Sequence, residues 1–301
     1  MRRVLIAVLV TGCLLTVAGV VVGLRESGEV GVPELELLGG TAPPVAQVSL
    51  AAPGTRYHYV ANVTGLAGPS RVGFNVLDIG AWEVESLPQG TRGLVWLGQR
   101  CPKPIDDRFR TTVRRLAQDP RVLGYYLTDE PYSRTCPGGP RALAGRAAFI
   151  RRVTGDRQRS FIALYRDFHA WRPSVTKVSM IGIVGFPCSR SHPSCDLGVI
   201  DEHVGKAARA GIPRRMMVPV YQAFGQEKAA YHYYRMPTTR QFRAVLARWA
   251  RLLPNPPMDY AYGWDHQRNA NPTLRDAIGI RTSLSTVFGY ASGRSGLRVG
   301  G

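Results

Sequence analysis

The sequence contains few acidic residues and almost no lysine for its size. Its 301 residues include 39 basic side chains against 21 acidic ones, which gives a formal net charge of +18, and only four of the basic residues are lysines. Such a charge would suit an anionic partner such as nucleic acid, acidic lipid or a cell-wall polymer. The arginines are scattered from Arg56 to Arg298, and no nucleic-acid-binding motif accompanies them. We therefore interpret the charge as an arginine-rich composition spread over helix surfaces. Contact with an anionic cell-wall polymer is the alternative, and we expect no nucleic-acid partner.

Several common catalytic motifs are also absent. There is no G-x-S-x-G nucleophile elbow, no H-E-x-x-H zinc helix and no G-x-x-x-x-G-K-[ST] phosphate loop. The six histidines are spread along the chain, and none pairs with another at the spacing of metal ligands. The sequence therefore predicts neither a metal site nor a bound cofactor.

Cysteine is scarce, with five residues in the whole chain. Cys13 lies in the apolar N-terminal run, which leaves an even number of cysteines beyond it, as in proteins of oxidising compartments. Cys188 and Cys195 can close one small loop, and Cys101 and Cys136 each follow a strand-like run. Neither pair has the C-x2-C spacing of structural zinc sites. We therefore predict two disulfides, Cys101–Cys136 and Cys188–Cys195.

Only one long apolar run occurs, at residues 4–24, and two arginines precede it. A basic end followed by a run of this length is typical of a secretory signal or a membrane anchor. The run is longer than a usual signal core and no clean small-x-small cleavage site follows, so we rank a retained anchor (residues 1–24) above a cleaved signal peptide. A lipoprotein box at Cys13 ranks third. In each case the remainder would be secreted or membrane-anchored and lie outside the cytoplasm.

Residues 25–55 are rich in glycine, proline and small residues, which is typical of a flexible stalk. Beyond them, β-rich runs alternate with amphipathic helices, and we find no internal repeat and no second domain. The predicted strands are 57–62, 72–79, 93–97, 122–127, 160–165, 178–184, 216–221 and 258–262, and the clearest helices are 105–120, 141–155, 238–254 and 273–288. The alternation predicts an α/β fold, a (β/α)8 TIM barrel over residues 56–301. Only residues 65–71 separate the first two strands, so either the first unit has lost its helix or 57–62 is not a barrel strand.

The stretch GYYLTDEP at 124–131 ends a buried strand with two acids and a proline. Polar residues at the carboxyl ends of barrel strands line the active-site mouth. Strict alternation would direct Tyr126 and Glu130 inward and turn Asp129 aside. The alternative is that the two acids only mark the start of the following helix.

This stretch resembles the strand-four signature of glycoside-hydrolase barrels of the (β/α)8 glycosidase superfamily. The resemblance covers roughly the whole barrel, although its specific part is short. It implies a carbohydrate substrate, with Glu130 as general acid/base and Asp129 beside it. Other predicted strand ends carry residues suited to sugars, because aromatic rings stack on sugar faces and polar groups bind hydroxyls. The candidate sugar-binding residues are Asn75, Asp78, Trp96, Tyr126, Tyr165, Tyr221, Gln222 and Trp264. An aromatic loop at 231–235 would roof the cleft.

One departure from that pattern is important. Barrels with a strand-four acid carry a nucleophilic glutamate at the end of strand seven, where this chain has Gln222. Asp265, Asp78 or Glu227 could supply a second carboxylate, or Asp129 and Glu130 could act with an acetamido group of the substrate. We therefore expect an extracytoplasmic glycoside hydrolase with Glu130, Asp129 and Asp265 as catalytic candidates. The alternative is a barrel that binds carbohydrate or a cell-envelope polymer without cutting it.

Overall fold

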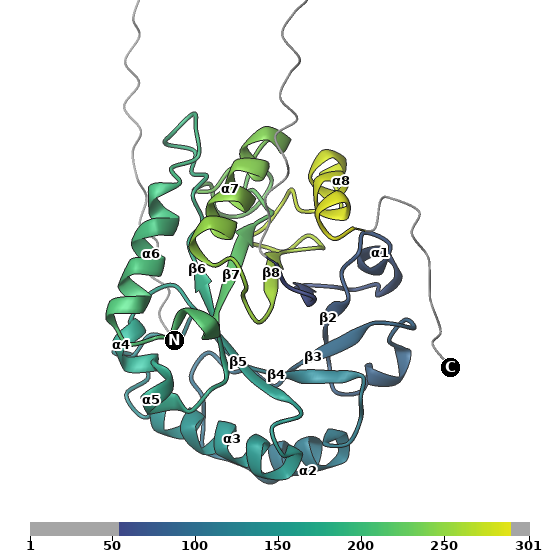
Figure 1. Ribbon diagram of the computed structural model, residues 1–301, viewed down its shortest axis with the longest axis vertical. Coiled ribbons are helices and arrows are strands. Elements are labelled where there is room, and N and C mark those ends of the chain that lie inside the picture. The colour runs from purple at the N-terminus through teal and green to yellow at the C-terminus, as the bar shows by residue number, and fades with distance from the viewer. Residues whose placement is uncertain (1–53, 290–301) are drawn as a thin grey trace, which may run out of the picture. The chain divides into compact units, whose positions relative to one another are not determined.

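The computed structural model describes residues 54–289, and these form a closed barrel of eight parallel strands in sequence order (Figure 1). The strands are β1 His58–Val60, β2 Val76–Ile79, β3 Arg92–Trp96, β4 Val122–Asp129, β5 Arg159–Leu164, β6 Met180–Val184, β7 Met217–Gln222 and β8 Asp259–Tyr262. Strand β8 pairs in parallel with both β7 and β1, which closes the barrel. The predicted (β/α)8 barrel is confirmed.

Helices surround the ring of strands on its outer side (Figure 1). The α-helices are α1 Ala67–Ser70, α2 Asp107–Leu116, α3 Gly139–Thr154, α4 Phe168–Trp171, α5 Pro173–Thr176, α6 Gly198–Arg209, α7 Thr239–Leu252 and α8 Ile278–Val287, and the short 3-10 helices are η1 Val84–Ser86 and η2 Arg214–Met216. The first unit is degenerate, because its connection contains only the four-residue helix α1. The first predicted strand nevertheless belongs to the barrel.

Local sequence signals explain where the longer helices begin and end. Asp106 caps α2 by accepting a hydrogen bond from the backbone N–H of Phe109. Thr238 and Gln241 form a reciprocal capping box at the start of α7. Gly155 ends α3 in the left-handed conformation, at φ 59°, which glycine adopts without the strain that a Cβ imposes.

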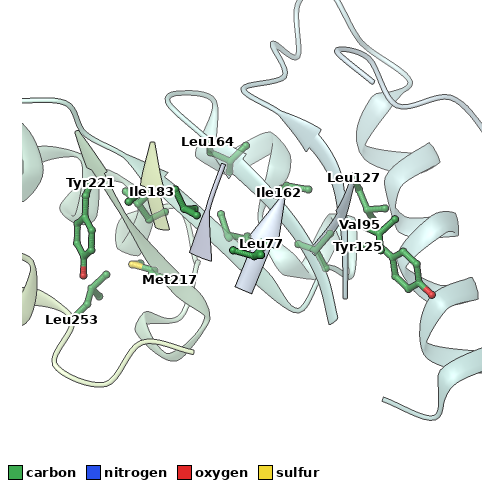
Figure 2. Packing of buried hydrophobic residues seen from close by; sticks show 14 of the residues in the cluster. Leu77, Val95, Tyr125, Leu127, Ile162, Leu164, Ile183, Met217, Tyr221 and Leu253 are labelled. Atoms are coloured by element: carbon green, nitrogen blue, oxygen red, sulfur yellow. The ribbon is translucent and has the colours of Figure 1, made fainter. Parts of the chain in front are cut away.

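The core has two layers. Side chains that point outward from the strands pack against the helices, and Figure 2 shows part of this layer, including Tyr125, Leu127 and Tyr221. The inward side chains fill the barrel itself with a cluster rich in aromatic rings, among them Tyr59 and Phe161. The interior is therefore a packed core that separates the two ends of the barrel, as in other barrels of this type.

Several boundaries differ from the predicted ones. Strand β2 begins at Val76 rather than at residue 72, β4 extends through Asp129, and the last helix begins at Ile278 rather than at residue 273. The predicted anchor and all but the end of the predicted stalk lie outside the described residues. No helix within residues 54–289 has both the length and the apolarity needed to cross a bilayer.

Candidate active site

Two adjoining cavities open at the carboxyl ends of the strands, with volumes of about 750 Å³ and about 310 Å³. They share Asp129, Tyr260, Tyr262 and Asn269 as lining residues. We refer to the two cavities together as the mouth cleft. Its position is the one at which barrels of this type carry their active sites.

Asp129 lies at the junction of the two cavities because β4 is irregular. The register between β4 and β5 shifts between Tyr126 and Thr128, so the strict alternation expected for this strand is interrupted. The Tyr126 hydroxyl donates a 2.6 Å hydrogen bond to Asp129 Oδ1, and Thr128 instead donates to the carbonyl oxygen of Gln99. The bulge therefore brings Asp129 into the cleft, which corrects the expectation that it would turn aside.

Glu130 also lines the cleft, on the side of the smaller cavity. Its backbone adopts φ 42°, in the left-handed region that residues with a Cβ seldom occupy, and its N–H donates to the Ala163 carbonyl oxygen. Such a conformation costs about 1–3 kcal/mol and is concentrated at functional sites. The strained backbone places the carboxyl group over the cleft, next to Asp129.

The surroundings raise the pKa of Glu130 to about 7. Partial removal of water by the surrounding protein is the main cause, and the negative charge of Asp129 adds to it. Arg166 and Arg100 act in the opposite direction. The side chain retains contact with solvent, as a proton donor to an incoming substrate must. Glu130 can therefore carry a proton at neutral pH.

A third carboxyl group, that of Asp78, lines the larger cavity at the end of β2. Its Oδ2 accepts a 3.0 Å hydrogen bond from the backbone N–H of Asn62. Burial raises the pKa of Asp78 to about 6, and the charges of Asp129 and Glu83 contribute to the increase. The charge of Asp129 thus raises the pKa of both Asp78 and Glu130. The pKa of Asp129 itself is also raised, mainly by burial.

Aromatic side chains border the mouth cleft. Trp96 at the end of β3 is 42% exposed and meets the ring of Tyr126 edge-on at 4.8 Å. Trp82 in the loop after β2 is 77% exposed, and Tyr165 after β5 is 40% exposed. Tyr234, from the aromatic loop expected to roof the cleft, lines the smaller cavity. Exposed rings beside carboxylates form a surface suited to sugar rings and their hydroxyls.

Of the residues predicted for the site, those that line the mouth cleft are Asp78, Trp96, Tyr126, Asp129, Glu130 and Tyr165. Five others lie elsewhere: Asn75, Tyr221, Gln222, Trp264 and Asp265. These five residues do not line the mouth cleft, which differs from the expectation that they contribute to the site.

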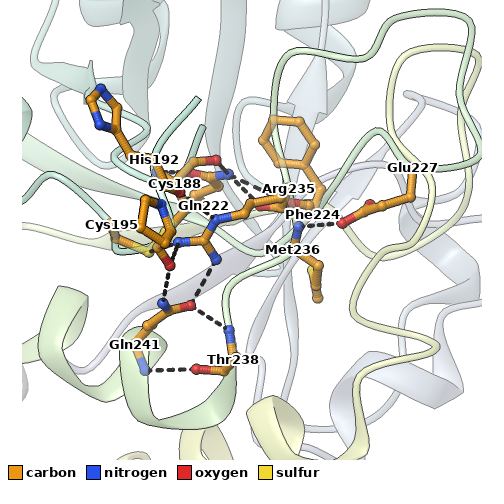
Figure 3. Close-up of a disulfide and its surroundings, with 11 residues drawn as sticks. Cys188, His192, Cys195, Gln222, Phe224, Glu227, Arg235, Met236, Thr238 and Gln241 are labelled. Carbon is orange, nitrogen blue, oxygen red and sulfur yellow. Dashed lines mark hydrogen bonds between the residues drawn. A yellow bond between two sulfur atoms is a disulfide. The ribbon is translucent and has the colours of Figure 1, made fainter. Parts of the chain in front are cut away.

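Gln222 is completely buried beneath the loops that follow β6 and β7 (Figure 3). Its Oε1 accepts from the Cys188 N–H, and its Nε2 donates to the carbonyl oxygens of Cys188 and Arg235. An amide satisfies both kinds of partner, whereas a carboxylate would face two carbonyl oxygens without a proton to donate. Gln222 therefore anchors two loops and does not contact the cleft. Glu227 is also engaged in this region, where its Oε1 accepts from the Met236 N–H.

The other four residues belong to the packing around the barrel. Tyr221 points outward against Phe242 of α7. Asn75 precedes β2 and bonds to the backbone of His58 and Arg56, so it lies at the start of the strand rather than at its end. The predicted strand began too early, which put Asn75 at the wrong end of the barrel.

Trp264 and Asp265 follow β8 and pack behind the cleft. The Trp264 ring is 7% exposed and contacts Phe74. The Asp265 carboxylate accepts from the N–H and hydroxyl of Thr64 and from Arg275. Asp265 is therefore fully engaged in joining the β8 loop to the β1 loop, and this position does not support a catalytic role.

Some cleft residues were missed in the sequence, namely Trp82, Glu83, Tyr260, Gln267 and Asn269. Tyr260 could have been found, because it shares the inward face of β8 with Tyr262. The others lie on loops, where no periodicity indicates direction. Among residues 54–289, no group of three histidine, cysteine or acidic side chains is arranged to hold a metal ion.

No protein-family model and no curated protein matches the sequence. Solved structures do match the fold. The spore cortex-lytic enzyme SleL of Bacillus cereus is 9% identical, with 78% of this chain and 74% of that chain covered and a TM-score of 0.51. A fungal endo-β-N-acetylglucosaminidase of glycosyl hydrolase family 18 is 10% identical, with coverage of 77% and 97% and a TM-score of 0.50. A GH128 endo-β-1,3-glucanase of Amycolatopsis mediterranei, in complex with laminaripentaose, is 10% identical, with coverage of 76% and 98% and a TM-score of 0.47.

These similarities define the class of the fold. The chain has a closed (β/α)8 barrel similar to those of SleL and of the family 18 endo-β-N-acetylglucosaminidase, which is the fold that the resemblance of GYYLTDEP implied. At this level of identity the likeness concerns the fold alone, so the activity has to be argued from the site.

Proposed function

We propose that this protein is an extracytoplasmic glycoside hydrolase in which Glu130 is the general acid/base. The observation that carries the proposal is a carboxyl group with a pKa of about 7 in a cleft bordered by exposed aromatic rings. A general acid works best when its pKa lies near the working pH, because it is then protonated and still able to release the proton. Glu130 would protonate the glycosidic oxygen as the bond to the leaving sugar breaks.

Asp129 is our candidate for the second carboxylate. Glycoside hydrolysis develops positive charge on the sugar ring, which a nearby carboxylate stabilises. Asp129 lies at the junction of the two cavities, and its hydrogen bond from Tyr126 holds it in one orientation. The nucleophile would be water activated by Asp78 or, on an N-acetylated sugar, the acetamido oxygen of the substrate. The stereochemistry of the product distinguishes these two routes, since direct attack by water inverts the anomeric centre.

The test uses the full chain and a panel of polysaccharides, with release of reducing ends as the measurement. Glu130→Gln keeps the shape of the side chain but removes its titratable proton, so turnover should fall by about 10²-fold or more while binding persists. The matched control is Glu202→Gln on the surface of α6, which should retain full turnover. Equal turnover by the wild type and Glu130→Gln would refute the role of Glu130.

The second candidate function is a non-catalytic carbohydrate-binding barrel. It is favoured by Gln222, which leaves β7 without a carboxylate at its end. In that case the wild type should cleave no glycan in the panel and should bind at least one as tightly as Glu130→Gln does. Isothermal titration of both proteins with the bound glycan decides between the two functions.

We also propose that the barrel works in an oxidising compartment. Disulfides join Cys101 to Cys136 and Cys188 to Cys195, which are the two predicted pairs and which persist outside the cytoplasm. The apolar run at 4–24 would attach the barrel to a membrane through the segment at 25–55. Recovery of the full chain in the soluble fraction without cleavage of its N-terminus would contradict attachment.

A further inference from the structure

A separate cavity of about 440 Å³ lies at the opposite end of the barrel, where the strands begin. Its walls come from the segments that lead into β1, β5, β6, β7 and β8. The packed interior of the barrel separates it from the mouth cleft. The cavity is therefore a distinct site, and none of its residues takes part in the proposed hydrolysis.

Three exposed arginines from separate parts of the chain line this cavity. Arg56 precedes β1, Arg159 begins β5 and Arg215 precedes β7. Within residues 54–289, no carboxylate lines the cavity and none of the three guanidinium groups has a hydrogen-bonded or ion-paired partner. The Arg56 guanidinium lies over the Tyr57 ring, 4.9 Å from its centroid. We refer to this cavity as the arginine pocket. Like charges gathered in this way repel one another, so an anion bound among them would be stabilised.

Two acids on this end of the barrel have partners outside the arginine pocket. Arg121 holds the Asp119 carboxylate with two guanidinium nitrogens, at 3.0 and 2.8 Å. Asp259 is buried and bonded to His58 at 2.9 Å. A fourth arginine, Arg92, donates to the Tyr57 hydroxyl at 3.3 Å and adds positive charge beside the wall. Neither Asp119 nor Asp259 lines the pocket, so its positive charge is not matched by a carboxylate in its own walls.

The size and walls of the arginine pocket indicate an organic anion rather than a bare ion. A volume of about 440 Å³ falls within the range of small-molecule sites. Tyr57, Met180 and Pro257 supply apolar surface, and Thr55 adds a hydroxyl. The planar fork of a guanidinium matches the oxygens of phosphate, and a phosphomonoester carries about −1.5 to −2 charges at neutral pH. A single carboxylate would leave most of the positive charge unmatched.

We propose that the arginine pocket binds a phosphate ester carried on a small organic group, independently of the glycan cleft. Such a group could belong to a soluble phosphorylated sugar or polyol, or to a lipid headgroup. The chemistry recognised is the same in the two cases, namely a phosphate held by arginines with its carbon-bearing part against Tyr57 and Met180.

The test titrates the full chain with glycerol 3-phosphate at low ionic strength. The triple variant Arg56→Gln/Arg159→Gln/Arg215→Gln should bind at least about ten-fold more weakly than the wild type, because it loses charge-assisted hydrogen bonds. The control is Arg151→Gln/Arg209→Gln/Arg240→Gln, which removes the same charge from exposed positions on α3, α6 and α7. It should bind like the wild type.

The proposal fails if both triple variants weaken binding equally, because bulk charge would then explain the affinity. It also fails if the wild type does not bind glycerol 3-phosphate at millimolar concentration. Vesicles of phosphatidic acid, a phosphomonoester lipid, in phosphatidylcholine identify the source of the ester. A lipid headgroup is assigned if glycerol 3-phosphate competes with vesicle binding and the triple variant of the arginine pocket no longer binds vesicles. A soluble ester is assigned if the wild type binds glycerol 3-phosphate but glycerol 3-phosphate does not compete with vesicles. Unfolding midpoints equal to that of the wild type confirm that both triple variants are folded.

Discussion

The two ends of the barrel differ in charge. The mouth cleft gathers carboxyl groups, Asp78, Asp129 and Glu130, whereas the cavity at the other end gathers the arginines of the arginine pocket. The formal net charge of +18 does not reveal this separation, because most of the arginines line neither the mouth cleft nor the arginine pocket. Net charge therefore describes the solubility and partners of the chain as a whole, while the location of the unpaired charges indicates where chemistry and binding occur.

The two ends also differ in how their loops are held. Both disulfides lie on the side of the mouth cleft, where Cys101 follows β3, Cys136 follows β4 and the remaining pair lies in the loop after β6. The loops that lead into the strands at the other end are shorter, as between α3, which ends at Thr154, and β5, which begins at Arg159. Long loops that carry a site need restraint because little of their backbone is held by the barrel ladder.

The largest effect on the free energy of unfolding should come from removing a disulfide beside the mouth cleft. Cys101→Ala/Cys136→Ala opens a link across a sequence separation of 35 residues, which should lower the free energy of unfolding by about 4 kcal/mol through the entropy of the unfolded chain. Cys188→Ala/Cys195→Ala, with a separation of 7, should cost about 2.5 kcal/mol. Urea unfolding of the three proteins measures both values. A larger loss for the shorter loop would contradict this reasoning.

The second prediction concerns the effect of the Asp129 charge on the pKa of Glu130. The Asp129 charge raises the pKa of Glu130, so Asp129→Asn should lower it. Since the proposed general acid works in its protonated form, the fall in kcat/KM with rising pH should move to lower pH in this variant. Glu202→Gln on the surface of α6 is the control, because Glu202 is not among the groups that shift the Glu130 pKa. If the fall in kcat/KM occurs at the same pH in Asp129→Asn as in the wild type, the Asp129 charge does not raise the pKa of the general acid.

The smallest expected effect is the change in the free energy of unfolding with pH that is caused by Glu130. The pKa of Glu130 is raised from 4.5 to about 7 on folding, so the folded state holds this proton more tightly than the unfolded state does. Its contribution to stability is full below pH 4.5 and is lost as the pH rises through 7. Glu130→Gln should therefore gain stability relative to the wild type between pH 5 and pH 8.

Glu202→Gln provides a control of opposite sign for this measurement. Lys206 holds the pKa of Glu202 below its usual value, so the ionised form of Glu202 stabilises the folded state. Glu202→Gln should therefore be less stable than the wild type by a constant amount between pH 5 and pH 8, and the difference should shrink as the pH falls below 4.5. Chemical unfolding at several pH values measures both differences, and a difference for Glu130→Gln that stays constant between pH 5 and pH 8, as expected for Glu202→Gln, would show that the mouth cleft does not raise the Glu130 pKa.

The alternation of strands and helices, the two cysteine pairs and the resemblance of GYYLTDEP were sufficient to predict the fold, because they depend on local periodicity and spacing. The site was predicted in part. Glu130, Trp96 and Tyr165 end strands that were identified correctly, and each lies at the mouth. Asn75 was misplaced because β2 begins later than its apolar run, and Trp82 was missed because it lies on a loop.

The sequence by itself determined the barrel, its order of strands and the end of β4 at which two carboxyl groups occur, since hydrophobic periodicity and turn residues act over a few residues. Only the tertiary structure decided which polar groups face the cleft. The bulge in β4 brings Asp129 inward, and the loops after β6 and β7 enclose Gln222, whose amide satisfies backbone groups distant in the sequence. The tertiary structure likewise brought Arg56, Arg159 and Arg215 together, because closing the barrel places the starts of all eight strands on one end.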